Sequence, residues 1–208
     1  MQKKIPDATK KRMVLLIELL KRWQKEHITS KEIAVLLGIK DYLVRYDFSF
    51  LDFPSEHRGF KNGYNVEILQ KDILTALFGN KENKELRKEK NICIVGLSRL
   101  GVSLLDDVFF EGSGFKVCAG FDSSLNRVEL IRSTFELFPA SRIEAVCREK
   151  NIEYAVLCCD KNEVQKMVDR LVKSGIKGIV NYTRSVFFVP EGVKVQNVSP
   201  AVALALVE

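Results

Sequence analysis

Two glycines and an aspartate occur in this sequence at the spacing of a nucleotide-binding turn. Gly96 and Gly101 frame the segment GLSRLG, which directly follows the apolar run 92–95. In a G-x-G-x-x-G turn, the first glycine makes the turn, the second admits a pyrophosphate, and the third lets a helix pack on a strand. Ser98 replaces the second glycine, so its Cβ crowds the pyrophosphate, while its hydroxyl can donate to a phosphate oxygen. Asp122, 21 residues after Gly101, is placed to accept hydrogen bonds from ribose hydroxyls.

A cysteine pair is the second group that could do chemistry. Cys158 and Cys159 follow an apolar run, at the point where ligands lie in open α/β sheets. A reactive thiolate needs an electropositive neighbour, which Lys161 could supply, whereas a buried cysteine is an inert thiol. We favour the buried thiol but keep Cys158 among the expected lining residues. The expected cofactor-binding residues are Gly96, Leu97, Ser98, Arg99, Leu100, Gly101, Asp122 and Cys158.

Neither a metal site nor a catalytic acid–base group is expected. The five cysteines form no C-x-x-C pair, and the only histidines, His27 and His57, lie far from them in the sequence, so zinc-ligand spacing is absent. A dehydrogenase needs a proton-transfer group beside the nicotinamide. Residues 91–208 contain no histidine. The sequence therefore favours nucleotide binding without turnover, and we expect a protein that is not an enzyme.

The composition and charge distribution point to a soluble protein with a basic N-terminal part. The chain has 208 residues, of which 46% are hydrophobic and 29% charged, as in globular chains of one or two domains. Residues 1–90 carry 19 Lys and Arg against 13 Asp and Glu, whereas residues 91–208 carry 14 of each. The net charge of +6 thus forms either a solvated basic face or a surface for an anionic partner such as DNA. The chain begins without the apolar stretch of a signal peptide, and the run 200–207 is too short to span a bilayer. A cytoplasmic protein without a membrane partner is expected.

The basic part has the pattern of a helix-turn-helix. Apolar residues at helical spacing over 13–23 predict a first helix that begins near Pro6 and Asp7. The segment Thr29–Glu32 is a capping box for a short second helix, which ends at Gly38. A third helix is expected over 41–51 after a short turn. This order is typical of a DNA-binding helix-turn-helix, although an ordinary helical hairpin has the same pattern.

The third helix has a polar, aromatic face opposite its apolar stripe. Side chains on such a face can bond base edges and phosphates in a major groove. A hairpin signal follows at residues 57–64, where an Asn-Gly pair predicts a tight turn with basic residues near its tip. A hairpin after a helix-turn-helix is a wing. The expected DNA-binding residues are Arg12, Ser30, Lys31, Tyr42, Arg45, Tyr46, Ser49, Arg58 and Lys61.

The C-terminal part alternates strand and helix patterns, as in a Rossmann-type parallel sheet with crossover helices. Strands are expected at 92–95, 116–121, 154–158 and 178–181, with weaker signals at 135–138, 186–189 and 194–198. Helices are expected at 66–78, before the sheet, and after Gly101, Ser141 and Lys161. The polar segment 79–90, GNKENKELRKEK, contains the expected linker between the two parts.

A short apolar helix is expected close to the end of the sequence. Ser199 and Pro200 form an N-cap and N1 pair, and residues 201–207 are apolar on every side. So short a helix is not stable in water by itself. It must be enclosed by its own domain or, through exchange, by a partner subunit. The sequence therefore indicates a homodimer.

Taken together, these segments resemble the Rex family of redox-sensing transcriptional repressors of bacteria across nearly the whole chain. The matching stretches are, in order, IPDAT with Arg12, SKEIAVLLGI, VRYDFSFL, RGFKNGYNV, GLSRLG, GFKVCAGFD, RLVKSGIKGIVN and VPEGVKVQNVSPAV. The resemblance implies a homodimer whose winged helix binds palindromic double-stranded operator DNA and whose Rossmann domain binds NADH or NAD⁺. It also implies that NADH closes the dimer and releases DNA, and that the C-terminal helices exchange between subunits. The residues that carry over to these roles are Arg45 and Ser49 for the recognition helix, Arg58 for the wing, Gly96 and Gly101 for the phosphate loop, and Asp122 for the ribose.

Several positions depart from the family pattern. Tyr46 stands where the family usually has lysine, and Ser98 replaces the second glycine. Asp107 stands where a tyrosine beside the nicotinamide is expected, and Ser199 where the family has aspartate. The sequence ends at Glu208, which makes the exchanged helix shorter. Because these departures cluster on the sensing side, we expect a weakened response to NADH.

The expected fold is α/β, with an N-terminal winged helix-turn-helix domain and a C-terminal Rossmann-type parallel-sheet domain. The expected boundaries are 1–79 for the DNA-binding domain, 80–90 for the linker, 91–198 for the NAD(H)-binding domain and 199–208 for the exchanged dimerisation helix. The expected function is a dimeric DNA-binding repressor that responds to NADH and NAD⁺. One alternative is a transcription factor of the same fold with another nucleotide effector or none. A second alternative, a small NAD-dependent oxidoreductase, is disfavoured because a catalytic base is missing.

Overall fold

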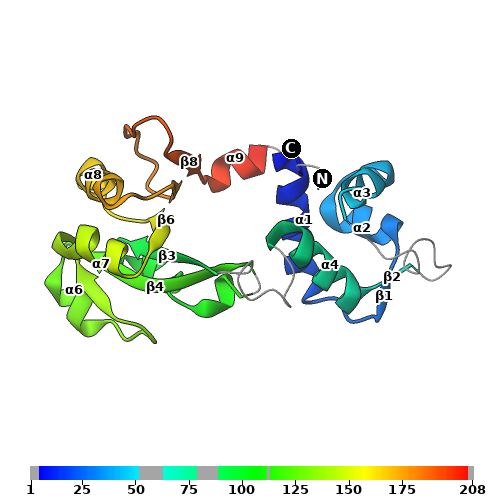
Figure 1. Ribbon diagram of the computed structural model, residues 1–208, viewed down its shortest axis with the longest axis horizontal. Coiled ribbons are helices and arrows are strands. Elements are labelled where there is room, and N and C mark those ends of the chain that lie inside the picture. Colours follow the sequence, from blue (N-terminus) through cyan, green and yellow to red (C-terminus); the bar gives the residue numbers. More distant parts are fainter. Residues whose placement is uncertain (1–4, 52–62, 79–88, 112, 206–208) are drawn as a thin grey trace. The chain divides into compact units, whose positions relative to one another are not determined.

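The computed structural model describes residues 5–51, 63–78, 89–111 and 113–205. These residues belong to two compact units, Met1–Lys88 and Glu89–Glu208 (Figure 1). Within the described ranges, no helix is long and apolar enough to cross a membrane. Most of the linker expected at 80–90 lies outside the described residues, and Lys90 already begins a strand.

The first unit contains the predicted helix-turn-helix. Its elements are α1 (Asp7–Leu20), β1 (His27–Ile28), α2 (Ser30–Leu37), α3 (Asp41–Phe48), β2 (Tyr64–Asn65) and α4 (Val66–Phe78) (Figure 1). The capping box starts α2, because the Glu32 N–H donates to Thr29 Oγ1 at 3.2 Å and the Thr29 N–H donates to the Glu32 carboxylate at 2.8 Å. Gly38 ends α2 in a left-handed conformation with a φ of 63°. Both predicted boundaries of this helix are confirmed.

The third helix is shorter than predicted. It ends at Phe48 instead of about Leu51 because the last turn tightens. The N–H groups of Phe50 and Leu51 donate to the carbonyls of Asp47 and Phe48, three residues earlier. The predicted apolar stripe is nevertheless present, since Leu51 is buried together with Val44 and Phe48.

One apolar core holds the first unit together. Its buried residues come from the four helices, β1 and the end of the α3 segment, and they are Met13, Leu16, Ile17, Leu20, Ile28, Ile33, Ala34, Val44, Phe48, Leu51, Val66, Leu69 and Ile73. Spacings of three and four residues place these side chains on one face of α1 and α4. The core therefore fixes α3 by its apolar stripe and leaves the opposite face of that helix in solvent.

A two-stranded antiparallel sheet joins distant parts of the first unit. Ile28 pairs with Tyr64, and His27 pairs with Asn65. The predicted wing at 57–64 falls mostly on residues 52–62, which lie outside the described part of the chain. The wing therefore stays a prediction.

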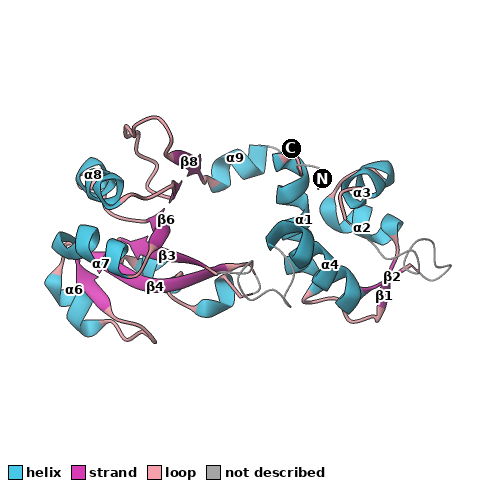
Figure 2. Ribbon diagram, in the orientation of Figure 1, coloured by secondary structure: helices cyan, strands magenta, loops and turns pink. Residues whose placement is uncertain are grey.

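The second unit is built on a six-stranded parallel sheet with the order β5-β4-β3-β6-β7-β8. Figure 2 shows strands of this sheet in magenta and the helices around it in cyan. The strands are β3 (Lys90–Val95), β4 (Phe115–Asp122), β5 (Leu137–Pro139), β6 (Ile152–Leu157), β7 (Gly178–Asn181) and β8 (Lys194–Asn197). The helices are α5 (Arg99–Ser103), α6 (Leu125–Leu130), α7 (Ile143–Glu149), α8 (Val164–Ser174) and α9 (Pro200–Ala205), with 3₁₀ turns η2 (Asp107–Phe109) and η3 (Ala140–Arg142). This strand order confirms the predicted Rossmann-type arrangement.

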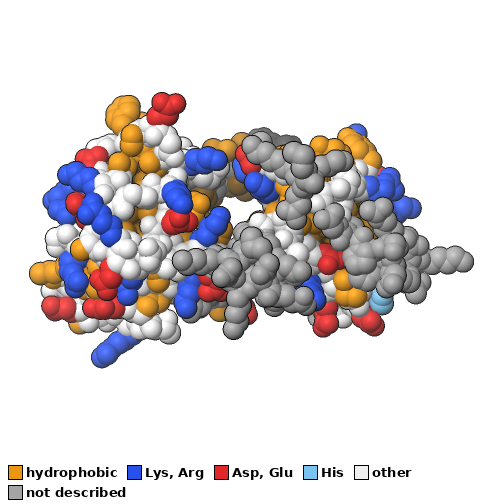
Figure 3. All heavy atoms as spheres, in the orientation of Figure 1, with side chains coloured by type: hydrophobic (Ala, Val, Ile, Leu, Met, Phe, Trp, Pro, Cys, Tyr) orange, Lys and Arg blue, Asp and Glu red, His pale blue; other side chains and the backbone are white. Residues whose placement is uncertain are grey.

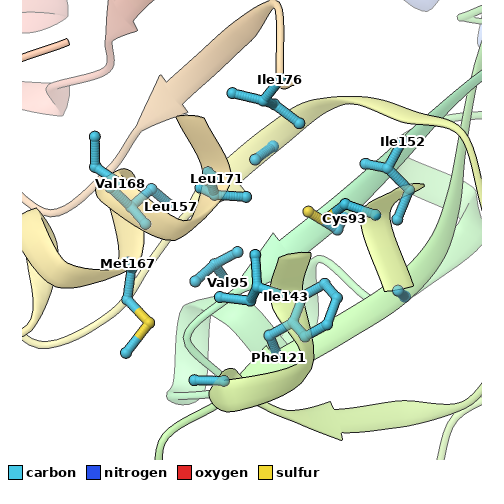
Figure 4. Close-up of a cluster of buried hydrophobic side chains, with 14 of the residues drawn as sticks. Cys93, Val95, Phe121, Ile143, Ile152, Leu157, Met167, Val168, Leu171 and Ile176 are labelled. Atoms are coloured by element: carbon cyan, nitrogen blue, oxygen red, sulfur yellow. The ribbon is translucent and has the colours of Figure 1, made fainter. Parts of the chain in front are cut away.

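Apolar side chains cover both faces of this sheet. Along β3, Cys93 and Val95 belong to one buried cluster, and Ile92 and Ile94 belong to the other. Successive side chains of a strand point to opposite faces, which explains the alternation. Figure 4 shows the first cluster, which residues of α7 and α8 cover. The two clusters fix the positions of the strand ends, where ligands bind in Rossmann-type folds.

One predicted strand is wrong, and one helix was not predicted. The apolar run 186–189 forms no strand. The Phe188 N–H donates to the Gln165 side chain at 3.0 Å, so this backbone bonds a helix side chain instead of a neighbouring strand. Helix α6 is six residues long and has no buried residue, so it is too short for an apolar repeat to predict it from the sequence. The other predicted strands are present, with boundaries within two residues of those expected.

Candidate functional site

The C-terminal ends of three strands meet at the centre of the second unit. The strand order reverses between β3 and β6, because the chain runs outward from β3 through β4 and β5 and then returns to β6. Ligands of open α/β sheets bind in the crevice at such a point. A narrow hollow there, too small to hold a water molecule, is lined by Val95, Gly96, Phe121, Asp122, Ser123, Arg127, Cys159, Asp160, Glu163 and Met167. The fold thus brings the glycine turn and the predicted carboxylate to one crevice.

Gly96 and Gly101 leave no room for a side chain. Gly96 has a φ of 96°, and a Cβ on it would overlap the backbone of Cys159. A Cβ on Gly101 would overlap the carbonyl oxygen of Gly96. The first glycine therefore makes the tight turn and the last allows close packing of α5, as the motif requires.

Ser98 stands at the N-terminus of α5, between these glycines. It is the N-cap residue, yet its side chain makes no capping hydrogen bond. Its hydroxyl donates instead to the carbonyl of Cys158, at 3.3 Å. The serine is therefore engaged with the end of β6. In the same turn, Leu97 is buried, whereas Arg99 and Leu100 are exposed.

Asp122, which the sequence predicts to bind the ribose, is buried and is bonded to protein donors. Its side chain is 2% exposed. One carboxylate oxygen accepts the Leu97 N–H at 2.6 Å, and the other accepts the Ser124 N–H at 2.7 Å. Arg127 Nη1 lies 3.1 Å from the first of these oxygens. A buried carboxylate with three donors has little capacity left for a ligand. Asp122 holds the glycine turn in place by accepting the Leu97 N–H.

The residues around Asp122 were not singled out from the sequence. Ser123 Oγ donates to Glu163 Oε2 at 2.7 Å, which links the end of β4 to the start of α8. Arg127 Nη2 lies 3.9 Å from Asp160, in the segment after β6. These side chains come from the segment after β4, from α6 and from the segment between β6 and α8. Their positions after strands were the only signal that could have found them.

Cys158 and Cys159 are neutral thiols at physiological pH. Burial raises the pKa of Cys158 to about 11. Burial, and then the negative charge of Glu163, raise the pKa of Cys159 to about 12. These shifts agree with the expected inert thiols and oppose a thiolate. Among the described residues, no group of three His, Cys, Asp or Glu side chains could hold a metal ion.

A second pocket lies at the C-terminal ends of β7 and β8. It is lined by Asn181, Arg184, Ser185, Val186, Phe187, Val189, Val195, Asn197, Val198 and Ser199. The buried amide of Asn181 donates to Asn197 Oδ1 at 2.8 Å and to the Ser185 carbonyl at 3.1 Å. Its oxygen accepts from the N–H and the hydroxyl of Thr183. Asn181 therefore orders the loop after β7.

The side chain of Asp107, expected beside the nicotinamide, lies outside the described part of the chain.

Helix α9 begins at Pro200 as predicted, and its apolar side chains are exposed. Val202 is 62% and Leu204 67% exposed, and the described part of α9 contains no buried residue. The loop that precedes β8 also exposes Val186 and Phe188, and orange side chains stand out over it in Figure 3. Exposed apolar side chains on so short a helix agree with the expectation that a partner covers it.

The predicted DNA-binding face of α3 is exposed. The side chains concerned are Tyr42, Arg45, Tyr46 and Ser49. Arg45 Nη2 lies 2.9 Å from Asp41 Oδ2, one helical turn earlier, so an ion pair holds the guanidinium along the helix. The Ser49 hydroxyl donates to the Tyr46 carbonyl at 2.7 Å. The face thus presents two aromatic rings and one cation to solvent.

Arg12 is placed differently from the other expected DNA-binding residues. It forms an ion pair with the buried carboxylate of Asp47, with the donating Nε 2.6 Å from Oδ2. Ser30 and Lys31 lie at the start of α2, where Lys31 is exposed. The expected wing residues Arg58 and Lys61 lie outside the described residues.

Two family models match this chain. Residues 87–185 match the family described as CoA binding domain, and residues 4–49 match the family described as putative DNA-binding protein N-terminus. The first match falls on the Rossmann-type unit and the second on the helix-turn-helix. The two matches therefore fall on different units of the structure.

Whole-chain relatives join these two parts. The chain is 33% identical over 175 residues to the redox-sensing transcriptional repressor Rex of Clostridioides difficile, covering 84% of this chain and 78% of that protein. It is 31% identical over 198 residues to the repressor Rex of Lactiplantibacillus plantarum, covering 94% and 84%. Both alignments run through the two units.

Solved structures of a Rex-family repressor, RSP, have the same fold. The structure of RSP in complex with β-NADH has a TM-score of 0.75 at 28% identity, covering 99% of this chain and 93% of RSP. RSP in complex with β-NAD⁺ and operator DNA has a TM-score of 0.73, covering 99% and 91%. Together with the identity and coverage of the curated relatives, this agreement shows that the chain belongs to the Rex family of redox-sensing transcriptional repressors.

Proposed function

We propose that this chain is a DNA-binding repressor that senses NADH and NAD⁺. One observation carries the proposal: a single chain holds an exposed helix-turn-helix face and a crevice with a glycine turn, in the order found in RSP. RSP has been seen with NADH, and with NAD⁺ and operator DNA. Membership of the Rex family supports the same assignment.

In this proposal the dinucleotide lies in the crevice above β3. The phosphate-binding turn comprises Gly96, Leu97, Ser98, Arg99, Leu100 and Gly101, with Cys158 beside it. Gly96 and Gly101 give the turn its shape. Asp122 accepts the Leu97 N–H and so keeps the turn in position. The shape of the glycine turn and the strand order support binding of a dinucleotide at this place.

The DNA-binding surface in this proposal is the exposed face of α3. Tyr42, Arg45, Tyr46 and Ser49 face base edges and phosphates, while Ser30 and Lys31 at the start of α2 contact the backbone. Arg58 and Lys61 of the predicted wing add further contacts. Arg12 contributes by fixing α3 through Asp47.

We further propose a cytoplasmic homodimer in which α9 is covered by the partner subunit. Palindromic operators require two copies of the recognition helix. The exposed apolar residues of α9 supply a surface for the second copy. The functional boundaries are those expected from the sequence: residues 1–79 for DNA, 80–90 as the linker, 91–198 for the nucleotide and 199–208 for dimerisation.

The proposal assigns regulation and no catalytic turnover to this chain. Residues 91–208 contain no histidine, and the two crevice cysteines are neutral thiols. A nucleotide other than NAD(H) remains the second candidate effector, because the matching family model for residues 87–185 is described as CoA binding. Ser98, Asp107 and Ser199 are the positions on the sensing side at which this chain departs from the family pattern.

The test is DNA affinity measured against NADH and NAD⁺ separately. An operator is first selected from a random duplex pool, and its binding is then titrated with each nucleotide. We expect salt-dependent, sequence-selective binding that NADH weakens more than NAD⁺, by a small factor, because only differential affinity for two states shifts an equilibrium. A pool without an enriched sequence contradicts the DNA assignment. Release by coenzyme A in place of NADH supports the second candidate.

A further inference from the structure

We propose that Glu163 reads the unphosphorylated ribose of the bound dinucleotide and thereby makes this chain select NADH over NADPH. The proposal rests on the nucleotide-binding function proposed above and assigns the selecting residue within that site. Glu163 replaces Asp122, the carboxylate that the Rossmann pattern would place in this role.

The first step is that Asp122 is already committed. Its two oxygens accept the N–H groups of Leu97 and Ser124 and face Arg127, and its side chain is almost fully buried. A ribose hydroxyl could be bound only by displacing one of these donors. Displacing the Leu97 N–H would also release the glycine turn. Asp122 therefore stabilises the glycine turn, and the ribose hydroxyls need another acceptor.

The second step is that Glu163 brings a carboxylate to the same strand end. It is the residue just before α8, and it is partly exposed and lines the crevice together with Gly96. Its Oε2 accepts the hydroxyl of Ser123 at 2.7 Å, and Ser123 directly follows Asp122 at the end of β4. The carboxylate therefore lies where a Rossmann fold holds the adenosine ribose. Only one of its oxygens is used by Ser123, so the other can accept a ribose hydroxyl.

The third step is the charge around this position. Among the described residues that line the crevice, Arg127 is the only cation, against the carboxylates of Asp122, Asp160 and Glu163. Arg127, whose side chain is 42% exposed, lies 3.1 Å from Asp122 and 3.9 Å from Asp160, so two carboxylates already share its charge. A phosphate on the ribose would bring two further negative charges beside the three carboxylates that line the crevice. Hydroxyls are therefore accepted and a ribose phosphate is repelled.

The test compares NADH and NADPH binding by the full-length wild type and Glu163→Gln. Glutamine keeps the size and can still bond Ser123, but it removes the charge. We expect NADH affinity to fall about tenfold, the effect of losing one charge-assisted hydrogen bond. NADPH affinity should stay constant or rise, so the NADH to NADPH preference should fall at least tenfold. Glu149→Gln, on the exposed side of α7, is the matched control and should leave both affinities unchanged.

A second variant separates binding from positioning. Ser123→Ala leaves the charge in place and removes the hydroxyl that orients it, so the preference for NADH should persist with a several-fold loss of NADH affinity. Thermal unfolding of each variant checks that the fold is retained. If Glu163→Gln leaves the NADH to NADPH preference of a nucleotide-binding wild type unchanged, the inference is overturned while the proposed function stands. Tighter NADH binding by Glu163→Gln also overturns it, because Glu163 then obstructs the ribose. A wild type that binds neither nucleotide contradicts the proposed function itself.

Discussion

Arg12 on α1 and Asp47 on α3 form a two-pronged ion pair inside the first unit. Arg12 Nε and Nη2 donate to the two oxygens of Asp47 at 2.6 and 2.7 Å. Thr9 Oγ1 donates to the same carboxylate at 2.8 Å. The Asp47 side chain is 4% exposed, and the pKa of Arg12 is raised, first by its hydrogen bond to Asp47. The ion pair thus fixes α3, which carries the proposed DNA-binding face, to α1.

The first prediction follows from this pair. Arg12→Met should destabilise the first unit by about 2–4 kcal/mol, because it leaves the Asp47 carboxylate buried with only one strong donor. The double variant Arg12→Met with Asp47→Leu should recover a large part of the loss, since no buried charge remains. Denaturant unfolding measures both values. Equal stability of the wild type and Arg12→Met would show that the pair contributes nothing.

The second prediction concerns the exposed face of α3. Arg45→Ala should cost about 1–3 kcal/mol of DNA affinity on the selected operator, because a base contact is lost. The same change should matter less on nonspecific DNA. Arg22→Ala, which removes an exposed arginine after α1, is the control for loss of charge alone. Anisotropy titrations on both duplexes provide the measurement, and equal losses for Arg45 and Arg22 variants would argue against base recognition by Arg45.

The third prediction concerns the capping box of α2. Thr29→Ala should lower the free energy of unfolding by about 1 kcal/mol. The pKa of Glu32 is lowered, first by the hydrogen bond from the Thr29 N–H and then by the Thr29 hydroxyl. A carboxyl group with a lowered pKa in the folded state stabilises the fold above its ordinary pKa of 4.5, and this contribution is lost as the pH falls through the lowered value. The stability difference between wild type and Glu32→Gln should therefore shrink on acidification below about pH 4.5. A difference that stays constant over this range would contradict the assignment.

The fourth prediction concerns the serine in the glycine turn. Ser98→Gly should raise NADH affinity roughly two- to tenfold, or about 0.4–1.4 kcal/mol, because it removes the Cβ beside the pyrophosphate. The change also breaks the hydrogen bond from Ser98 to the Cys158 carbonyl. Ser141→Gly, at an exposed position before α7, is the control. Fluorescence titration of bound NADH gives the result, and weaker binding by Ser98→Gly would mean that the hydroxyl contributes more than the Cβ obstructs.

The fifth prediction concerns assembly. Deletion of residues 200–208 removes α9 and should convert the dimer to monomer or aggregate, since Val202 and Leu204 then no longer bury apolar area against a partner. Tight binding to a two-site operator should be lost as well. Deletion of 206–208 alone leaves the described α9 in place and serves as the control. Light scattering that shows an unchanged dimer after the longer deletion would exclude α9 from the interface.

Local signals in the sequence were sufficient for both ends of α2, the start of α9 and the order of the strands, but they missed α6, placed the end of α3 too late and expected after Gly101 a helix that begins at Arg99. The capping box at Thr29, the left-handed Gly38 and the start at Pro200 depend on neighbours within four residues, so their chemistry is visible in the sequence itself. Alternating apolar runs predicted the parallel sheet for the same reason. The strand expected at 186–189 was wrong because its backbone partner, Gln165, lies about twenty residues away, on a helix.

The sequence by itself determined the two-unit plan, the glycine turn and the family resemblance, because each rests on a contiguous motif. Only the tertiary structure decided how the polar residues are used. Arg12 lies 35 residues from Asp47, Asp122 lies 25 residues from Leu97, and Ser123 lies 40 residues from Glu163. These partners meet because apolar packing brings their elements together. A sequence pattern does not show which donors will bond a buried carboxylate.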